Sequence, residues 1–279
     1  MNIISAFFKG ILYVFSFLTP LSYEGMDGLI YYTNFNLITG GYDSILPIIT
    51  SFSVILAIVY FLKSDLFLLY KTSGCLLKDI KEKKLNLDIK EEDKKHLLMF
   101  IFGSFTLVFT PLFELLFKGM RGNTVIISLG LILSAFFIIM SGFIKEKNLK
   151  SSNETILNAV SVSVFRMLSI IPGLSGVAGM YFISLVSGFT KEFAFKFTYL
   201  ITLVWAVFSF IRNIIMLFIH GVTVNYGVFY YIFFTIGAIG ISGFSIYLFK
   251  KSIENKKTHY FGIFNIILAI ITFLIFIRG

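Results

Sequence analysis

The chain has 279 residues and a net charge of +9; 57% of its residues are hydrophobic and only 14% are charged. Soluble domains carry about 25% charged residues, so this composition excludes a pair of soluble domains and predicts one membrane domain over residues 1–279. The positive charge then reports membrane topology rather than a nucleic-acid surface, and no nucleic acid is expected as a partner. A single cysteine, Cys75, excludes a disulfide framework or a cysteine metal site.

Residues 3–34 form an apolar stretch that is interrupted in its middle. Pro20 cuts the stretch, and Ser22, Glu24 and Asp27 follow among glycines. A spanning helix needs about 20 consecutive apolar residues, and a proline in the interior breaks a helix. We therefore predict a re-entrant hairpin of two short helices here.

Six further apolar runs are long enough to cross the membrane. They are the ranges 44–62, 97–117, 125–144, 193–219, 228–249 and 260–277. Residues 63–95 are rich in lysine and acidic residues and are expected to form a polar loop on the cytoplasmic side, in which 77–95 forms either a surface helix or a mobile loop. Residues 145–153 are predicted to form a short polar turn.

A second interrupted stretch covers residues 154–190. Pro172 and Gly173 break it, and Gly176 and Gly179 follow within one turn. Both interrupted stretches carry a proline, then a serine, then a glycine, which is typical of inverted repeats whose broken helices face each other. Freed backbone groups at such a break must be buried in protein or reach water. Helix ends in that position are suited to a charged ligand.

The distribution of lysines orients this arrangement. With six spans and two hairpins that do not cross, the lysine clusters in ranges 63–95, 145–150, 191–196 and 250–257 all fall on one side. The positive-inside rule makes that side cytoplasmic, and both termini then face outward. The fold class predicted is therefore an all-α integral membrane bundle with six transmembrane helices and two facing re-entrant hairpins.

Three groups of residues around the second break keep a common register. They are Ile171-Pro172-Gly173-Leu174-Ser175, Gly188-Phe189-Thr190-Lys191-Glu192 and Phe197-Thr198-Tyr199-Leu200. In this pattern the chain resembles the undecaprenyl-diphosphate phosphatases, the bacitracin-resistance membrane phosphatases of bacterial cell-wall lipid recycling. The resemblance implies a protein of the bacterial plasma membrane whose ligand is a polyprenyl phosphate or diphosphate lipid. No cofactor is expected, and a homodimer is one option.

The chain departs from this family at its polar positions. Tyr13 and Phe17 stand where the family has glutamates, and Met26 stands where it has a histidine. Gly176 stands where it has an arginine. Phenylalanine and methionine cannot transfer protons, and glycine has no side chain to hold a phosphate. The resemblance therefore indicates a degenerate member that lacks most of the family's catalytic residues, and it leaves the catalytic residues of this chain unknown.

Arg166, in the second interrupted stretch, offers a replacement for the lost cation. An arginine in an apolar hairpin is costly, so it acts as a phosphate clamp, pairs with Glu24 or Asp27, or extends to the interface. Arg212 is expected to be an interface anchor. Ser22 and Ser175 either satisfy broken-helix backbone groups or attack phosphorus. The predicted lipid-phosphate site comprises Ser22, Glu24, Asp27, Arg166, Ser175 and Gly176.

Three functions remain open from the sequence. The first is a protein that binds, and moves, a polyprenyl phosphate lipid without hydrolysing it. The second is an active diphosphatase with rearranged catalytic groups, in which Glu24 would serve as general base. The third is a small-molecule transporter or structural subunit built on the same inverted-repeat scaffold. A polar cavity around one phosphate-sized space favours the first two, and a cavity open to both faces favours transport.

Overall fold

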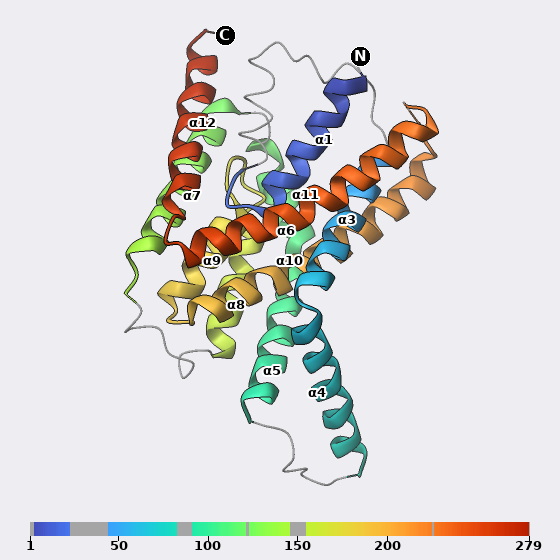
Figure 1. Cartoon of the computed structure of the whole chain (residues 1–279), viewed down its shortest axis with the longest axis vertical. Helices are drawn as coiled ribbons and strands as arrows, with labels where there is room; N and C mark the ends of the chain where they lie inside the picture. The colour runs from blue at the N-terminus through green and yellow to red at the C-terminus, as the bar shows by residue number, and fades with distance from the viewer. Residues whose placement is uncertain are drawn as a thin grey trace.

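The computed structural model of the protein describes residues 3–22, 44–82, 91–120, 123–145, 155–224 and 226–278. Within these ranges the chain is helical and contains no strand. In Figure 1, α4 and the start of α5 project from one end of the molecule, while α1 begins and α12 ends at the other. The helices in chain order are α1 (Ile3–Leu18), α3 (Leu46–Phe61), α4 (Lys63–Glu82), α5 (Glu91–Thr106), η1 (Leu107–Phe109), α6 (Thr110–Phe117), η2 (Lys118–Met120), α7 (Thr124–Phe143), α8 (Ile156–Leu168), α9 (Gly176–Val186), α10 (Lys191–His220), α11 (Val228–Glu254) and α12 (His259–Arg278).

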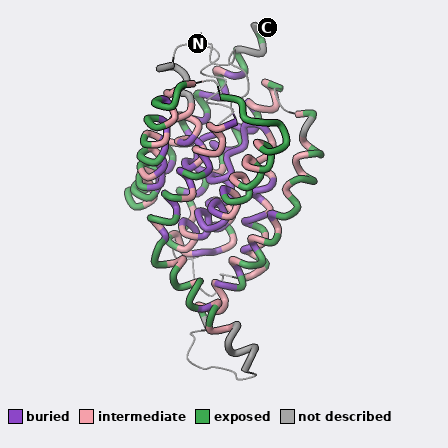
Figure 2. Tube along the Cα trace, turned by 90° about the vertical axis from the view of Figure 1, so that its right-hand side faces the viewer, coloured by how far each residue is buried: buried purple, intermediate pink, exposed green. Residues whose placement is uncertain are grey.

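Buried residues gather along the centre of the bundle, and exposed ones cover its outside (Figure 2). Many of the exposed residues are large and apolar, such as Leu115, Phe143 and Phe218, each more than 70% exposed. A soluble monomer rarely exposes so much apolar surface, whereas a bundle in lipid exposes it throughout. The pattern of exposure therefore agrees with the composition in placing this protein in a membrane.

Four helical runs of the described residues are long and apolar enough to cross a membrane: Glu92–Phe117, Thr124–Phe143, Lys191–His220 and Val228–Glu254. The pair α3 and α4, bent by 82°, would supply a fifth. The sixth predicted span corresponds to α12, which ranks among the shorter apolar helices over its described residues His259–Leu274. The multi-pass helical bundle is confirmed, while the count of six spans and the two re-entrant paths stay predictions.

The predicted span at 97–117 is not one continuous helix. It begins earlier, at Glu91, and the 3-10 turn η1 separates α5 from α6. Pro111 has no N–H to donate to the carbonyl four residues before it, which is that of Leu107. The hydroxyl of Thr110 donates to that Leu107 oxygen at 2.6 Å instead. The proline thus explains the irregular segment that sequence periodicity did not predict.

Residues 63–82 form the helix α4, which corrects the expectation of a polar loop beginning at residue 63. The choice between a surface helix and a mobile loop for 77–95 stays open, because residues 83–90 lie outside the described residues.

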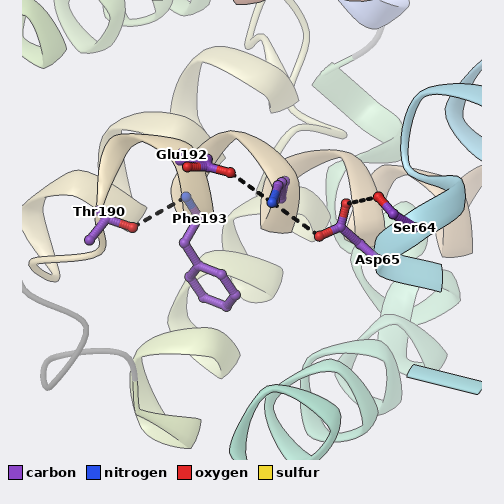
Figure 3. A network of polar contacts seen from close by, with 6 residues as sticks. Ser64, Asp65, Thr190, Glu192 and Phe193 are labelled. Carbon is purple, nitrogen blue, oxygen red and sulfur yellow. Dashed lines mark hydrogen bonds and ion pairs between the residues drawn. The ribbon is translucent and has the colours of Figure 1, made fainter. Parts of the chain in front are cut away.

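Lys196 of α10 contacts Asp65 of α4 at 3.2 Å and Glu192 at 2.8 Å. Dashed lines from Asp65 and Glu192 mark these ion pairs in Figure 3. Beside this network the hydroxyl of Thr190 caps α10 by accepting from the N–H of Phe193 at 3.3 Å. These contacts join α4 to the start of α10, although ion pairs this exposed stabilise a protein only weakly.

The predicted break in the second interrupted stretch is confirmed, since α8 ends at Leu168 and α9 begins at Gly176. Its backbone packs against α7. A Cβ at Gly130 would collide with the carbonyl of Pro172, and Gly173 has a φ of 83°. The hydroxyl of Ser134 donates to the Gly173 oxygen at 3.1 Å and accepts from the Ser175 N–H at 2.7 Å. Backbone groups freed at membrane depth therefore find partners inside the protein.

The first interrupted stretch also breaks at its proline, because α1 ends at Leu18. Side chains of other helices satisfy the freed carbonyl groups. The hydroxyl of Tyr199 donates to the Leu18 oxygen at 2.6 Å, and the amide of Asn265 donates to the Pro20 oxygen at 2.8 Å. The remainder of the predicted hairpin, residues 23–34, lies outside the described residues.

Candidate functional site: an arginine-lined cavity between the two breaks

A cavity of about 630 Å³ lies between the two breaks. The break after α1 contributes to its wall, as do η1, α6, the break between α8 and α9, and one face of α10. Its polar and charged lining residues are Tyr13, Ser16, Ser22, Thr110, Glu114, Arg166, Ser169, Ser175, Ser209 and Arg212. The two broken stretches therefore line one common space, although they lie about 150 residues apart in the sequence.

Arg166 is the charge at the buried end of this cavity. It lies in the last turn of α8 and is only 4% exposed. Its guanidinium carbon is 4.8 Å from the ring centroids of both Phe17 and Trp205, within the range of cation–π contacts. Its Nε is buried and has no hydrogen-bond partner among the described residues. The rings hold the guanidinium in place without neutralising its charge.

The guanidinium of Arg166 lies against the N-terminus of α9. A Cβ added to Gly176 would collide with its Nη1, so the guanidinium fits there only because this position has no side chain. The hydroxyl of Ser175 caps α9 by accepting from the Ala178 N–H at 3.3 Å. The first turn of a helix carries partial positive charge. The arginine and the start of α9 thus place two positive features on one wall of the cavity.

A second arginine lies toward the exposed side of the cavity. Nη1 of Arg212 is 2.7 Å from a carboxylate oxygen of Glu114, and the pair joins α10 to α6. The two side chains are 53% and 29% exposed, respectively. Arg212 follows Trp205 by seven positions, so both lie on one face of α10 about 10 Å apart along its axis. The cavity therefore runs from a desolvated arginine to a paired, partly solvated one.

Four of the six predicted site residues are brought together. Ser22, Arg166, Ser175 and Gly176 all line the cavity and are buried. Glu24 and Asp27 lie outside the described residues, so the expected ion pair between Arg166 and one of them stays a prediction. Binding of a lipid phosphate by these residues also stays a prediction.

Sequence reasoning missed four residues of this site. Phe17 and Trp205 flank the arginine, and neither was expected to contact it. Glu114 and Arg212 pair across the cavity, whereas Arg212 was expected only as an interface anchor. The available signal was one charged residue within each of two predicted spans, Glu114 in 97–117 and Arg212 in 193–219, because charged side chains inside a membrane usually pair with each other. The partner of each one depended on which helix faces became neighbours.

The lining of the cavity supports anion binding better than metal binding. No group of three or more His, Cys, Asp and Glu side chains that could hold a metal ion occurs in the described part of the chain. Glu114 is the carboxylate among the described lining residues, against two guanidinium groups. Arginine offers a planar set of N–H donors that suits phosphate. What this cavity can do chemically is hold a phosphate-like anion beside apolar and aromatic surface.

Comparison with known proteins gives a consistent picture. The family model described as Bacitracin resistance protein BacA matches residues 4–271. A Methanococcus vannielii protein named undecaprenyl-diphosphatase is 26% identical over 208 residues, which cover 74% of this chain and 75% of that protein. A Shouchella clausii protein named undecaprenyl-diphosphatase 1 is 26% identical over 139 residues, which cover 50% of each. The chain thus spans half the length of the second relative and three quarters of the first.

Proposed function

The chain belongs to the bacitracin resistance protein BacA family, and on that premise we propose that it binds the phosphate end of a polyprenyl phosphate or diphosphate lipid without hydrolysing it. It is a multi-pass membrane protein, and the plasma membrane is the location that fits this family. The ligand class follows from the names of the two relatives, both undecaprenyl-diphosphatases. The lipid chain would lie against the apolar exterior, with the phosphate in the cavity.

The observation that carries the proposal is the setting of Arg166. Burying a charge costs several kcal/mol unless it is paired, and no carboxylate pairs with this guanidinium in the described part of the chain. Phe17 and Trp205 compensate part of the cost through their ring faces. A phosphate group placed between Arg166 and the start of α9 would compensate the remainder. The site is therefore organised for an anion that arrives with the ligand.

The absence of hydrolysis is proposed from the side chains that face this position. Tyr13 and Phe17, at the positions where the resemblance places glutamates, line the cavity beside Arg166. Neither is a carboxylate that could take a proton from water near neutral pH. Glu114 accepts a charge-assisted hydrogen bond from Arg212 and is held away from that role. Among the described residues of the cavity, groups for binding and positioning are present, whereas no free carboxylate faces the proposed phosphate position.

The proposal is tested by binding of undecaprenyl phosphate to the purified full-length protein. Arg166→Ala should weaken binding by about 100-fold, the usual scale for truncating one partner of a buried charge pair. Arg166→Lys should restore it only in part, because the fork geometry is lost. Arg212→Ala, the matched removal of a charge from the exposed side, should weaken binding by less than about fivefold. Equal effects of the two alanine variants would contradict the proposal.

The second candidate is an active undecaprenyl-diphosphatase with a rearranged site. Family membership and the presence of Glu114 in the cavity favour it. In that case Glu114 would release Arg212 and act as general base, with Arg166 stabilising the charge on phosphate oxygens. Phosphate release from undecaprenyl diphosphate, measured with and without divalent metal, distinguishes the two functions. Turnover lost in Glu114→Gln would establish this candidate and overturn binding without hydrolysis.

The orientation in the membrane is part of the proposal. Asp65, Glu192 and Lys196 form a charged network at the end of the bundle from which α4 projects (Figures 1 and 3). The lysine-rich side is proposed to be cytoplasmic, with both termini outside. A cysteine introduced between residues 78 and 92 should be labelled only from the cytoplasmic side, and one at position 2 only from outside. Labelling of both from the same side would contradict the orientation and the six-span arrangement.

A further inference from the structure

A second cavity, of about 410 Å³, lies beside the turn between α11 and α12. Phe15 and Leu21 line it from the first interrupted stretch, and Tyr260 lines it from α12. Lys251 and Lys257 supply its positive charge from the end of α11 and the turn that follows. The proposed function assigns no role to this cavity, whose wall is almost entirely aromatic and aliphatic and whose two lysines are exposed.

The two lysines of this cavity are available to an anion. Nζ of Lys251 lies 5.6 Å from the ring centroid of Tyr247. Within the described residues, no carboxylate comes within ion-pair distance of Lys251 or Lys257. Basic pockets between membrane helices are suited to lipid headgroups on the lysine-rich side of a membrane. The two exposed lysines beside the cavity therefore suit the same chemical class of ligand as the Arg166 cavity.

The two cavities extend toward opposite ends of the bundle. The ring of Phe249, two positions before Lys251, is 6.1 Å from that of Phe195, which is next to Lys196 near the start of α10. Arg212 of the first cavity lies sixteen positions after Lys196 on the same helix, or about 24 Å along its axis. One cavity is thus near the basic end of the bundle, and the other extends toward the far end.

Leu21 is the residue common to the two linings. It is 5% exposed and lies in the non-helical segment after α1, so no helical hydrogen bond fixes its position. The backbone before it is held at the Leu18 and Pro20 carbonyl oxygens by Tyr199 and Asn265, respectively. Leu21, on an anchored break, therefore borders both the cavity with the buried arginine and the cavity with the two lysines.

We infer that the two cavities are the two ends of one path for a lipid phosphate headgroup, and that Leu21 is its barrier. The inference rests on the proposed function for the nature of the ligand. The headgroup enters beside Lys251 and Lys257, passes Leu21 when its side chain turns away, and reaches Arg166. The lipid tail stays outside the bundle, in the membrane. No bond is made or broken in this movement.

The path is tested with full-length protein in phosphatidylcholine vesicles that contain undecaprenyl monophosphate. A phosphatase added outside converts the accessible lipid, and the slow phase reports transfer from the inner leaflet. Leu21→Ala should accelerate that phase by about tenfold, because it removes the barrier side chain. Leu21→Phe and Leu21→Trp should slow it toward the rate of protein-free vesicles. Replacing Lys251 and Lys257 together by Gln should also slow it.

Leu18→Ala is the matched control, since Leu18 is a fully buried leucine three positions earlier that lines neither cavity. It should leave the slow phase at the wild-type rate. Equal rates for wild type, Leu21→Ala and Leu21→Phe, or equal acceleration by Leu18→Ala, would overturn the path. Binding that survives Arg166→Ala would instead refute the proposed function, and the Leu21 series would still decide whether the two cavities are connected.

Discussion

The two arginines of the cavity, Arg166 and Arg212, lie on the same side of α10 in opposite surroundings. Arg166 is buried between the rings of Phe17 and Trp205, and its Nε has no described partner. Arg212 is half exposed and paired with Glu114. Residue type and formal charge are identical, so the difference between the two is one of solvation and partner.

This contrast shows which charge in the cavity is expected to depend on a ligand. A paired, solvated arginine gains little from a further anion, because water and the carboxylate already compensate its charge. A desolvated arginine without a carboxylate gains much more, since electrostatic interactions strengthen as the local dielectric falls. Arg166 is thus the position where ligand binding and protein stability are expected to oppose each other.

The largest expected effect comes from Arg166→Met, which keeps an unbranched side chain between the rings and removes the charge. Undecaprenyl phosphate binding should fall by about 100-fold. The ligand-free protein should become more stable by about 1–3 kcal/mol, because a buried charge with no carboxylate partner among the described residues is lost. Thermal unfolding in detergent, with and without lipid, measures both quantities. A loss of stability would indicate a carboxylate partner, for which Glu24 and Asp27 are the sequence candidates.

Gly176→Ala sharpens the same comparison from the start of α9, on the same wall of the cavity as Arg166. The new Cβ would occupy the position of Arg166 Nη1 and push the guanidinium away from the start of α9. Binding should weaken by about tenfold with little change in stability. Gly240→Ala is the control, since a Cβ at that position in α11 would contact nothing within 4 Å. It should leave binding intact and stabilise the protein by about 0.5–1 kcal/mol.

Ser134→Ala tests the support behind the cavity rather than the cavity itself. It removes both the hydrogen bond to the Gly173 oxygen and the one from the Ser175 N–H. The buried Ser175 N–H at the break loses its acceptor, which should cost about 1–3 kcal/mol of stability. Ser128→Ala is the matched control, because that buried hydroxyl bonds only within its own helix, to Thr124. Equal losses in the two variants would show that the break does not depend on α7.

The sequence predicted the broken stretches well because prolines and glycines act locally. Pro20 and Pro172 remove backbone donors wherever they occur, so the ends of α1 and α8 follow from the residue type alone. The same reasoning was not applied to Pro111. The span 97–117 was therefore predicted as one continuous helix, and the 3-10 turn η1 was missed. The local rule thus predicted the helix ends at Pro20 and Pro172, the two prolines to which it was applied.

The contacts of the site could not be predicted in the same way. Arg166 was singled out because a charge in an apolar stretch needs a partner. Phe17 and Trp205 lie about 150 and 40 residues from it in the sequence, and nothing local indicates which aromatic rings will flank a guanidinium. That information lies in the packing of α1, α8 and α10 around the cavity.

The smallest expected effect concerns Glu114 and Arg212. Because both side chains are partly solvated, a double-mutant cycle with Glu114→Gln and Arg212→Gln, measured on the free energy of unfolding, should give a coupling energy of about 0.2–1 kcal/mol.

The same cycle measured on lipid binding has two distinct outcomes. If Glu114 only neutralises Arg212, its substitution frees a cation at the exposed side of the cavity and should strengthen diphosphate binding by about threefold while monophosphate binding is unchanged. If Glu114 is instead a general base, the substitution should abolish turnover and leave both affinities unchanged, and the pair would then be a resting form of a rearranged active site.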